Sequence, residues 1–233
     1  MSTTNRFASL DDLVVGVNNE KAFEAVKNMV ALFPKPGVLL LYGPSGSGKT
    51  ALLRAAVSEK IEDNPDLKIL WQSSEDYIRL LIAAIKGKDT EAFQRGYIGR
   101  QLLVIDNLED FGGKSVTQTG LAENIARAFN SGAQVFLAAN HYCKPLKVEA
   151  MLREMIPDFT VVDLTLPDQL TLERAWISYG KSIGISCSSE YMEFFHKSSD
   201  IQNFWALNGL LQSYLTQGKF IFNETTTAKD HKK

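Results

Sequence analysis

One short stretch of the sequence has the residue types that hold a polyphosphate. Residues 43–50 read GPSGSGKT, which fits the pattern G-x-x-x-x-G-K-[ST], and the apolar run 38–42 precedes it as a buried strand should. Glycines let backbone N–H groups turn toward a phosphate, and the positive end of the following helix adds to the attraction. A chance Gly/Ser loop is the alternative, which the strand and helix signals on either side disfavour.

This pattern assigns a role to each residue of the loop and of the first helical turn. Lys49 is expected to reach the β and γ phosphates of ATP or ADP, and the Thr50 hydroxyl is expected to bind Mg²⁺. The nucleotide-binding candidates of this stretch are Gly43, Pro44, Ser45, Gly46, Ser47, Gly48, Lys49, Thr50, Ala51 and Leu52.

Three polar residues that follow apolar runs are the catalytic candidates. Asp106 ends the run LLVID and is expected to hold Mg²⁺ through water, the alternative being an aspartate that caps a turn. Asn107 stands where a water-activating acid would sit, and an amide can orient water but cannot take its proton. Asn140 closes the next apolar run, where it either contacts the γ phosphate or attacking water or is an ordinary turn asparagine.

These residues need elements that bring them together. Apolar runs predict strands at 38–42, 67–74, 101–111, 133–140 and 159–167, and helical spacing predicts helices at 51–59, 75–87 and 119–132. Strands that alternate with helices indicate an α/β fold with a five-stranded, mostly parallel sheet. Beyond Pro167 only helical patterns follow, at 168–184, 188–199 and 200–218. The expected division is therefore an α/β nucleotide-binding domain at 1–167, a small helical lid at 168–222 and a flexible tail at 223–233.

Composition sets broad limits on function. The chain has 233 residues, of which 45% are hydrophobic and 22% charged, with a net charge of −2. The sequence contains no apolar run long enough for a membrane span and no signal-peptide pattern, so we expect a cytoplasmic protein without membrane contact. Cys143 and Cys187 indicate neither a disulfide framework nor a zinc site. A near-neutral charge gives no overall attraction to nucleic acid.

The ordered series of motifs resembles the AAA+ ATPases and, within them, the bacterial replication initiator DnaA and its short relative Hda. The resemblance covers about Leu10 to Ile221, through LDDLVVGVNN (10–19), SSEDYIRLLIAAIKGKDTEAF (73–93) and GGKSVTQTGLAENIARAFNSGAQVFLAAN (112–140). It implies a P-loop NTPase core with a helical lid, and ATP or ADP with Mg²⁺ as the ligand. It also places three residues near the adenine and one at the lid position called sensor 2: Val14, Val15, Asn19 and Gln202.

Several departures from that family pattern concern catalysis. The position of the family's arginine finger is Met155, with Arg153 only a weak substitute, and the sensor 2 arginine is replaced by Gln202. Asn107 replaces a second acid. Because an arginine finger alone is worth about 10³ to 10⁵ in rate, we expect nucleotide binding to persist while turnover is weak or absent.

Other departures concern DNA. The resemblance places the basic single-strand-binding positions at Gln94, Gly96 and Ile98. Arg95 and Arg100 remain, either as contacts to single-stranded DNA or as ordinary charges of a solvated face. Ile78 keeps an apolar contact position. The duplex-reading domain of DnaA is expected to be missing after the lid, and the segment MSTTNRFASL lacks the glutamine of Hda's clamp-binding motif. We therefore expect weak or no direct DNA binding.

The resulting hypothesis is an ATP- or ADP-binding, DnaA/Hda-like protein that regulates replication initiation through protein contacts. Its expected partner is the replication initiator or another replication protein, together with self-association through AAA+ surfaces. One alternative is an active, Hda-like ATPase in a mixed assembly whose partner donates the arginine. Another is a loader-type adaptor that recruits helicase.

Overall fold

The apolar runs of the sequence form one parallel sheet whose strands lie in the order β2-β3-β4-β1-β5. The computed structural model describes residues 9–140, 147–198 and 201–216, so the tail expected at 223–233 lies outside the described residues. The strands are β1 (Gly37–Tyr42), β2 (Ile69–Ser73), β3 (Leu102–Asp106), β4 (Gln134–Ala139) and β5 (Phe159–Asp163). The three central strands β3, β4 and β1 are almost wholly buried, as expected of a parallel sheet that is covered on both faces.

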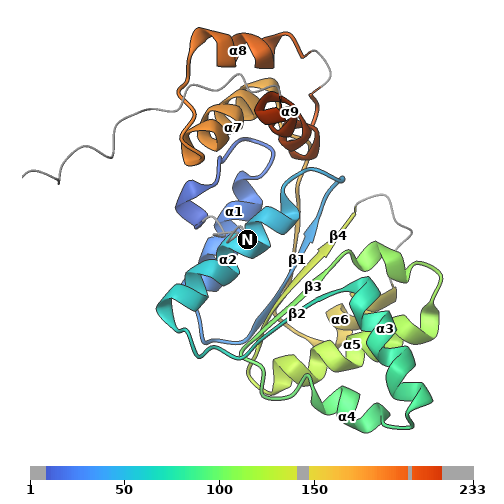
Figure 1. The fold of residues 1–233 in the computed structure, drawn as a ribbon. Coiled ribbons are helices and arrows are strands. Elements are labelled where there is room, and N and C mark those ends of the chain that lie inside the picture. Colours follow the sequence, from blue (N-terminus) through green and yellow to red (C-terminus); the bar gives the residue numbers. More distant parts are fainter. Residues whose placement is uncertain (1–8, 141–146, 199–200, 217–233) are drawn as a thin grey trace, which may run out of the picture.

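Helices cover the two faces of this sheet (Figure 1). One face packs against α1 (Glu20–Ala31) and α2 (Lys49–Asp63), and the other against α3 (Ser74–Lys86), α5 (Ser115–Asn130) and α6 (Lys147–Met155). Strand β1 alternates between these layers, because successive side chains of a strand point to opposite faces: Leu39 and Leu41 pack with α1 and α2, and Val38 and Leu40 pack with the other layer.

The short helix α4 (Thr90–Arg95) follows α3 and is held by aromatic contacts. Tyr77 of α3 meets Phe93 edge-on at 5.4 Å between ring centres and Phe111 at 5.5 Å. The buried Tyr97 hydroxyl donates a hydrogen bond to Gln72 at 2.6 Å. Burial raises the pKa of Tyr77 to about 12, although its hydrogen bond with Asn124 opposes the shift. These hydroxyls are therefore neutral hydrogen-bonding groups of the core.

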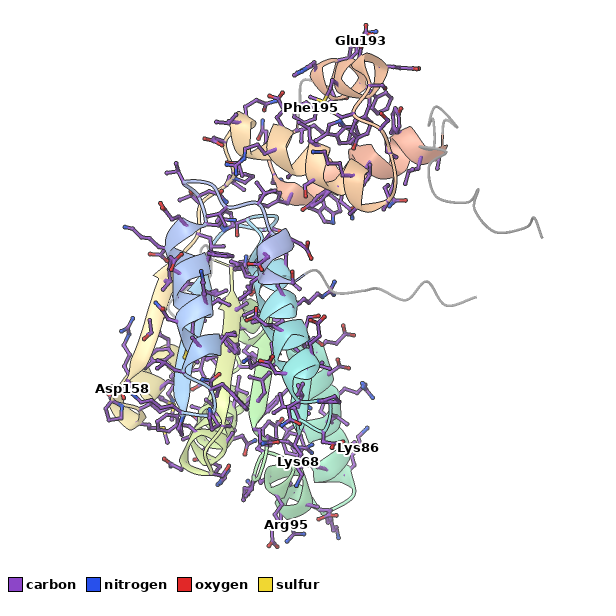
Figure 2. All side chains as sticks on the ribbon, turned by 90° about the vertical axis from the view of Figure 1, so that its left-hand side faces the viewer. Lys68, Lys86, Arg95, Asp158, Glu193 and Phe195 are labelled. Carbon is purple, nitrogen blue, oxygen red and sulfur yellow. The ribbon has the colours of Figure 1, made fainter. Side chains whose placement is uncertain are left out.

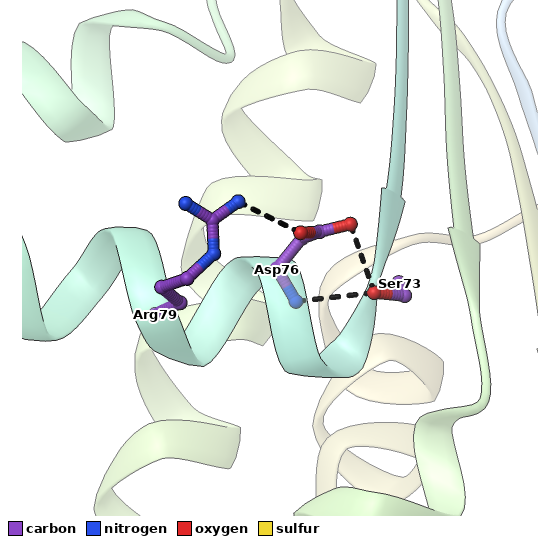
Figure 3. Close-up of polar contacts among 3 residues, drawn as sticks. All are labelled: Ser73, Asp76 and Arg79. Atoms are coloured by element: carbon purple, nitrogen blue, oxygen red, sulfur yellow. Dashed lines mark hydrogen bonds and ion pairs between the residues drawn. The ribbon is translucent and has the colours of Figure 1, made fainter.

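The start of α3 is fixed by a local hydrogen-bond network (Figure 3). The Ser73 hydroxyl oxygen accepts from the backbone N–H of Asp76 at 3.1 Å and donates to the Asp76 carboxylate at 3.0 Å. Arg79 pairs with the other carboxylate oxygen at 2.8 Å. Ser73 therefore supplies the cap that the free N–H groups of a helix start require, directly after strand β2 ends.

Three further helices form a separate layer beyond the sheet: α7 (Gln169–Ser182), α8 (Ser189–His196) and α9 (Phe204–Thr216). Their core is built on Trp176, which stacks on Tyr191 with ring centres 4.4 Å apart. Trp176 donates its indole N–H to the Tyr191 carbonyl, and the Tyr191 hydroxyl donates to the Trp176 carbonyl. Phe195 lies in the same buried cluster, at the end of the molecule opposite Lys86 and Arg95 (Figure 2).

The five-stranded parallel α/β sheet followed by a helical lid is confirmed, with different limits for several elements. The strand predicted at 101–111 ends at Asp106, and a 3-10 turn at Leu108–Phe111 follows because Asn107 has a left-handed backbone with φ 62°. The strand predicted at 159–167 ends at Asp163. The helix predicted at 200–218 begins at Phe204, so Gln202 lies in the preceding loop. No described helix is long and apolar enough to span a bilayer.

Candidate nucleotide-binding site

The strand order brings the ends of three strands together. Strand β4 pairs with β3 on one side and with β1 on the other, all parallel. The phosphate loop follows β1, Asp106 ends β3 and Asn140 follows β4, so the three features lie at the same edge of the sheet. In open α/β sheets this edge, at the carboxyl ends of the strands, is where ligands bind.

The loop between β1 and α2 depends on its glycines. Gly46 and Gly48 have φ of 78° and 103°, which only glycine adopts readily. A side chain on Gly43 would meet the carbonyl oxygen of Leu164 at 2.6 Å, and one on Gly46 would meet Asn203 at 2.7 Å. Gly48 is also the N-cap of α2, so the first N–H groups of that helix face the loop.

Lys49 is only 8% exposed and lies across the inside of the loop. Its ammonium donates to the carbonyl oxygens of Gly43 at 2.7 Å and Pro44 at 3.0 Å, and to Asn140 Oδ1 at 3.0 Å. Burial lowers the pKa of Lys49 from its ordinary value of 10.5, and the nearby acids Glu109 and Asp106 oppose that shift. Lys49 is thus a buried cation. Phosphate oxygens can bind it by taking the place of the two carbonyl oxygens.

Thr50 and Asp106 are in direct contact. The Thr50 hydroxyl donates to Asp106 Oδ2 at 2.8 Å, and the backbone N–H of Asn107 donates to Asp106 Oδ1 at 2.9 Å. Asp106 is 7% exposed. The two oxygen ligands expected for Mg²⁺ are therefore neighbours, one on the first turn of α2 and one at the end of β3.

Asn140 contacts Glu109, an acid that was not among the predicted site residues. Its backbone N–H donates to Glu109 Oε2 at 3.0 Å, and its side-chain nitrogen donates to Glu109 Oε1 at 2.6 Å. Glu109 reaches this point because the left-handed Asn107 turns the chain back toward the end of β4. The signal available in the sequence was a carboxylate three residues after Asp106, beyond an asparagine that tolerates positive φ.

The side chain of Asn107 is exposed and lines a cleft of about 630 Å³ between the loop and the lid. Lys49, Thr50, Ala51 and Asn140 line the same cleft from the sheet side. From the end of α7, the residue that follows it and α9, it is lined by Tyr179, Ser182, Ile183, Phe204, Trp205, Asn208, Leu211, Gln212 and Leu215. Polar phosphate-facing groups at one end and apolar lid side chains at the other suit a nucleotide.

Val14, Val15 and Asn19, which were expected near the adenine, are not among the residues that line this cleft. Asn19 accepts from the backbone N–H of Gly16 at 2.8 Å and donates to the Val14 carbonyl at 3.0 Å, so its side chain closes a turn. Val14 packs against the lid core, and Arg174 of α7 donates to the Val15 carbonyl at 3.1 Å. This segment joins the lid to the sheet domain.

The lid meets the loop just after Gln202. The backbone N–H of Phe204 donates to the Gly46 carbonyl at 2.9 Å, and Asn203 lies against Gly46. Gln202 itself is exposed and is not among the residues that line the cleft. The contact between lid and loop is therefore made by neutral groups.

The candidate arginine-finger segment lies on α6. Met155, its last residue, is 43% exposed. Arg153 makes two hydrogen bonds to Glu149, at 3.1 and 2.8 Å, and packs over the Phe159 ring at 5.5 Å. Glu149 also accepts from the Tyr42 hydroxyl at 2.6 Å, so Arg153 is held on its own subunit.

The described residues fit a phosphate and Mg²⁺. The Ser47 hydroxyl is buried in the loop without a hydrogen-bond partner among the described groups. A bound phosphate would supply that partner, as buried polar groups normally require. No cluster of three or more acidic, histidine or cysteine ligands occurs in the part of the chain that the structure describes. The neighbouring oxygens of Thr50 and Asp106 suit Mg²⁺, which typically takes one or two protein ligands and completes its shell with water and phosphate oxygens.

Comparison with known proteins identifies a family with this arrangement. Residues 4–161 match the family described as the bacterial DnaA ATPase domain. The chromosomal replication initiator protein DnaA of Francisella tularensis subsp. novicida (strain U112) is 28% identical over 221 residues, which are 93% of this chain and 44% of the relative. The chain thus spans less than half the length of this relative.

Solved structures share the fold. Domain III of the replication initiation protein DnaA of Thermotoga maritima superposes with a TM-score of 0.78 at 23% identity, covering 91% of each chain. A replication initiator DnaA bound to AMPPCP and single-stranded DNA superposes with a TM-score of 0.76 at 20% identity, covering 93% of this chain and 67% of that one.

Proposed function

Because the chain belongs to the family of the bacterial DnaA ATPase domain, we propose that it binds ATP or ADP with Mg²⁺ and regulates replication initiation through protein contacts. The observation that carries this proposal is that Lys49 and Thr50 line one cleft and that the Thr50 hydroxyl contacts Asp106 behind it. Lys49 would bind the phosphates, Thr50 would bind Mg²⁺ directly and Asp106 would hold it through water. Mg²⁺ would neutralise phosphate charge.

We propose that intrinsic ATP hydrolysis is weak. Asn107 lines the cleft but cannot take a proton from water, and Asn140 can only orient one. Gln202 offers no charge to the phosphates from the lid, and Met155 offers none to a neighbouring subunit. The bound nucleotide then acts as a regulatory ligand more than as a source of energy through hydrolysis.

The partner in this proposal is the replication initiator or another cytoplasmic replication protein, or a second copy of the chain through AAA+ surfaces. Residues 1–167 would hold the nucleotide, and 168–222 would act as a lid, since α7 to α9 have their own core around Trp176. Val14, Val15 and Asn19 would border the adenine from the segment that joins the two. An active ATPase in a mixed assembly is the second candidate, because Met155 at the finger position leaves the arginine to be donated by the partner.

The test is nucleotide titration with turnover on the purified chain. Lys49→Ala should weaken ATP and ADP binding by more than about tenfold, measured by calorimetry, whereas Lys197→Ala, at the exposed end of α8, should not. Affinity that is unchanged in Lys49→Ala would refute the site. Phosphate release near about 1 s⁻¹, abolished by Lys49→Ala, would show a working ATPase and refute weak hydrolysis. Acceleration only with added initiator would favour the mixed assembly.

Direct DNA binding is proposed to be weak. Arg95 pairs with Glu91 at 2.7 Å, and Arg100 donates to the Gly96 carbonyl, so these two arginines would have to leave partners within the chain to neutralise phosphates. Arg95 also lies at the end of the molecule away from the lid (Figure 2). Fluorescence anisotropy should give a Kd for single-stranded DNA weaker than about 1 μM at physiological salt. Nanomolar binding with a steep salt dependence would instead indicate an initiator-like role.

A further inference from the structure

Helix α3 carries an apolar stripe that the described part of the chain leaves uncovered. Ile82 and Ile85 are 47% and 57% exposed, and Ile78 is only partly buried against the core. The three isoleucines follow one another at spacings of four and three positions, so they lie along one face of the helix. Single exposed apolar side chains are ordinary, whereas several on one face indicate a contact surface.

The stripe borders an open groove of about 700 Å³ between α3 and the turn that leads into α5. Arg79 on the α3 wall pairs with Asp76 at 2.8 Å. Lys114 on the opposite wall donates to the Asp110 carbonyl, also at 2.8 Å. Both cations of the groove thus already have partners. The groove shares no lining residue with the nucleotide cleft, and α3 lies on the outside of the sheet domain, away from the lid (Figure 1).

The two ends of the stripe carry opposite charges. Glu75 lies in the first turn of α3 and Lys86 in its last, both exposed, and neither makes an ion pair with another described residue. Glu75 precedes Ile78 by three positions, and Lys86 follows Ile82 by four, so both charges share the face of the isoleucines. This face is therefore negative at one end, apolar in the middle and positive at the other end.

The pattern is complementary to its own reverse. When two copies of α3 lie antiparallel, Ile78 of each can pack beside Ile82 of the partner subunit. Because Glu75 and Lys86 each lie about one helical turn beyond that pair, Lys86 of each copy then meets Glu75 of the partner subunit. Antiparallel helix dipoles add to this attraction. A second copy of the chain thus matches both the apolar and the charged parts of the face.

We propose that α3 is the interface of a two-fold symmetric pair of these chains. In such an interface the same surface of both copies is used, and residue i contacts j while j contacts i, so assembly stops at two copies. The pair leaves the nucleotide cleft and the Met155 end of α6 free. The inference goes beyond the proposed function and does not depend on nucleotide binding.

Sedimentation velocity over a range of protein concentrations measures the Kd of the pair. Ile82→Glu should raise that Kd by about tenfold or more, since each substitution occurs twice in a two-fold interface. Ile61→Glu is the matched control, because Ile61 on α2 is 40% exposed and belongs to the layer on the other face of the sheet. It should leave the Kd unchanged.

Charge reversal tests the antiparallel register. Glu75→Lys or Lys86→Glu alone would place like charges against each other at both ends of the pair, so each variant should dimerise at least about tenfold more weakly. An equimolar mixture of the two variants should form a mixed pair of about wild-type affinity, because opposite charges then meet at both ends. Failure of the mixture to recover dimerisation would overturn this register and the proposal.

Further outcomes separate this inference from the proposed function. Lys49→Ala should dimerise as the wild-type chain does, so loss of nucleotide binding alone leaves the pair standing. A wild-type chain that stays monomeric at about 100 μM, or a dimer that Ile82→Glu leaves intact, would overturn the proposal. So would a dimer that only Met155→Glu breaks, since the contact would then lie on α6. Single-stranded DNA binding that a monomeric chain loses in Ile82→Glu would assign the face to DNA instead.

Discussion

Lys49 is a cation whose protonation is opposed by its surroundings. It is buried beneath the loop, and burial lowers its pKa although Glu109 and Asp106 act in the opposite direction. Its charge is nevertheless what phosphate oxygens require. Loss of the Lys49 proton should therefore weaken nucleotide binding at a lower pH than that at which ordinary lysines lose theirs.

The expected result is that ADP affinity begins to fall with rising pH while the pH is still below the ordinary lysine pKa of 10.5. Stability without nucleotide should have the opposite sign. Because the folded pKa of Lys49 is the lower one, the unfolded chain binds more protons in this window, so its contribution to the unfolding free energy rises with pH. Calorimetry across pH, with urea unfolding in parallel, checks both signs.

Residual ADP binding by Lys49→Ala serves as the control, and should change little over the same pH range. An equally steep decline in that variant would assign the effect to another group. A flat wild-type profile up to about pH 10 would mean that Lys49 keeps its proton in spite of burial.

Individual residues differ in how far the sequence revealed them. The loop and Asp106 could be predicted from local patterns, because neighbouring residues in the sequence indicate the strand, the turn and the start of the helix. Asn140 could be placed at a strand end for the same reason. Glu109 could not, since its position depends on the left-handed backbone of Asn107 and on β3 lying next to β4, and neither is visible in local spacing.

At the scale of elements, the start of α3 depends on a short hydrogen-bond network. Ser73→Ala should lower the unfolding free energy by about 1 kcal/mol, because the hydroxyl that caps the Asp76 N–H is lost. Urea denaturation measures this. Ser73→Thr keeps a hydroxyl and should retain most of the stability. A loss in the threonine variant as large as in alanine would show that the cap is not what stabilises α3.

The same network predicts a pH dependence. Hydrogen bonds from Arg79, and then from Ser73, hold the pKa of Asp76 below its ordinary value of 3.8. The stabilisation is therefore present above the unfolded pKa and is lost as the pH falls through the folded one. The stability difference between wild type and Asp76→Asn should shrink in acid below about pH 4. A difference that persists there would contradict a role for the charge.

Element types were more predictable than element ends. The apolar runs were long enough to identify each strand of the sheet, but strand β3 stops at Asp106 where the sequence predicted continuation to Phe111. Residues 108–111 read LEDF, and their two apolar residues stand three positions apart, which suits the 3-10 turn that follows Asn107 and not an alternating strand. Likewise α9 begins at Phe204 because Asn203 caps it, its side chain accepting the N–H of Ala206.

At the scale of the whole molecule, the cleft joins the sheet to the lid. Trp205 lines it from α9 and is 79% exposed, whereas Trp176 is buried in the lid core. A nucleotide that fills the cleft should cover the Trp205 indole. Tryptophan emission should therefore shift to shorter wavelength at saturating MgADP, and Trp205→Phe should abolish the shift.

Trp71 on β2 provides the matched control for this experiment. Trp71→Phe should keep the response, since Trp71 lies outside the residues that line the cleft. A shift that survives in Trp205→Phe, or vanishes in Trp71→Phe, would mean that the ligand binds elsewhere or that its effect spreads through the sheet.

The bond between Phe204 and Gly46 has a mechanical consequence. One peptide unit of the phosphate loop carries the carbonyl that accepts the first N–H of α9. A rotation of that peptide plane must either tilt α9 or break the hydrogen bond. The backbone torsion angles around Gly46 are therefore coupled to the orientation of the lid. A protein that binds the side of α8 away from the cleft and tilts the lid would thus change the conformation of the phosphate loop without contacting the nucleotide.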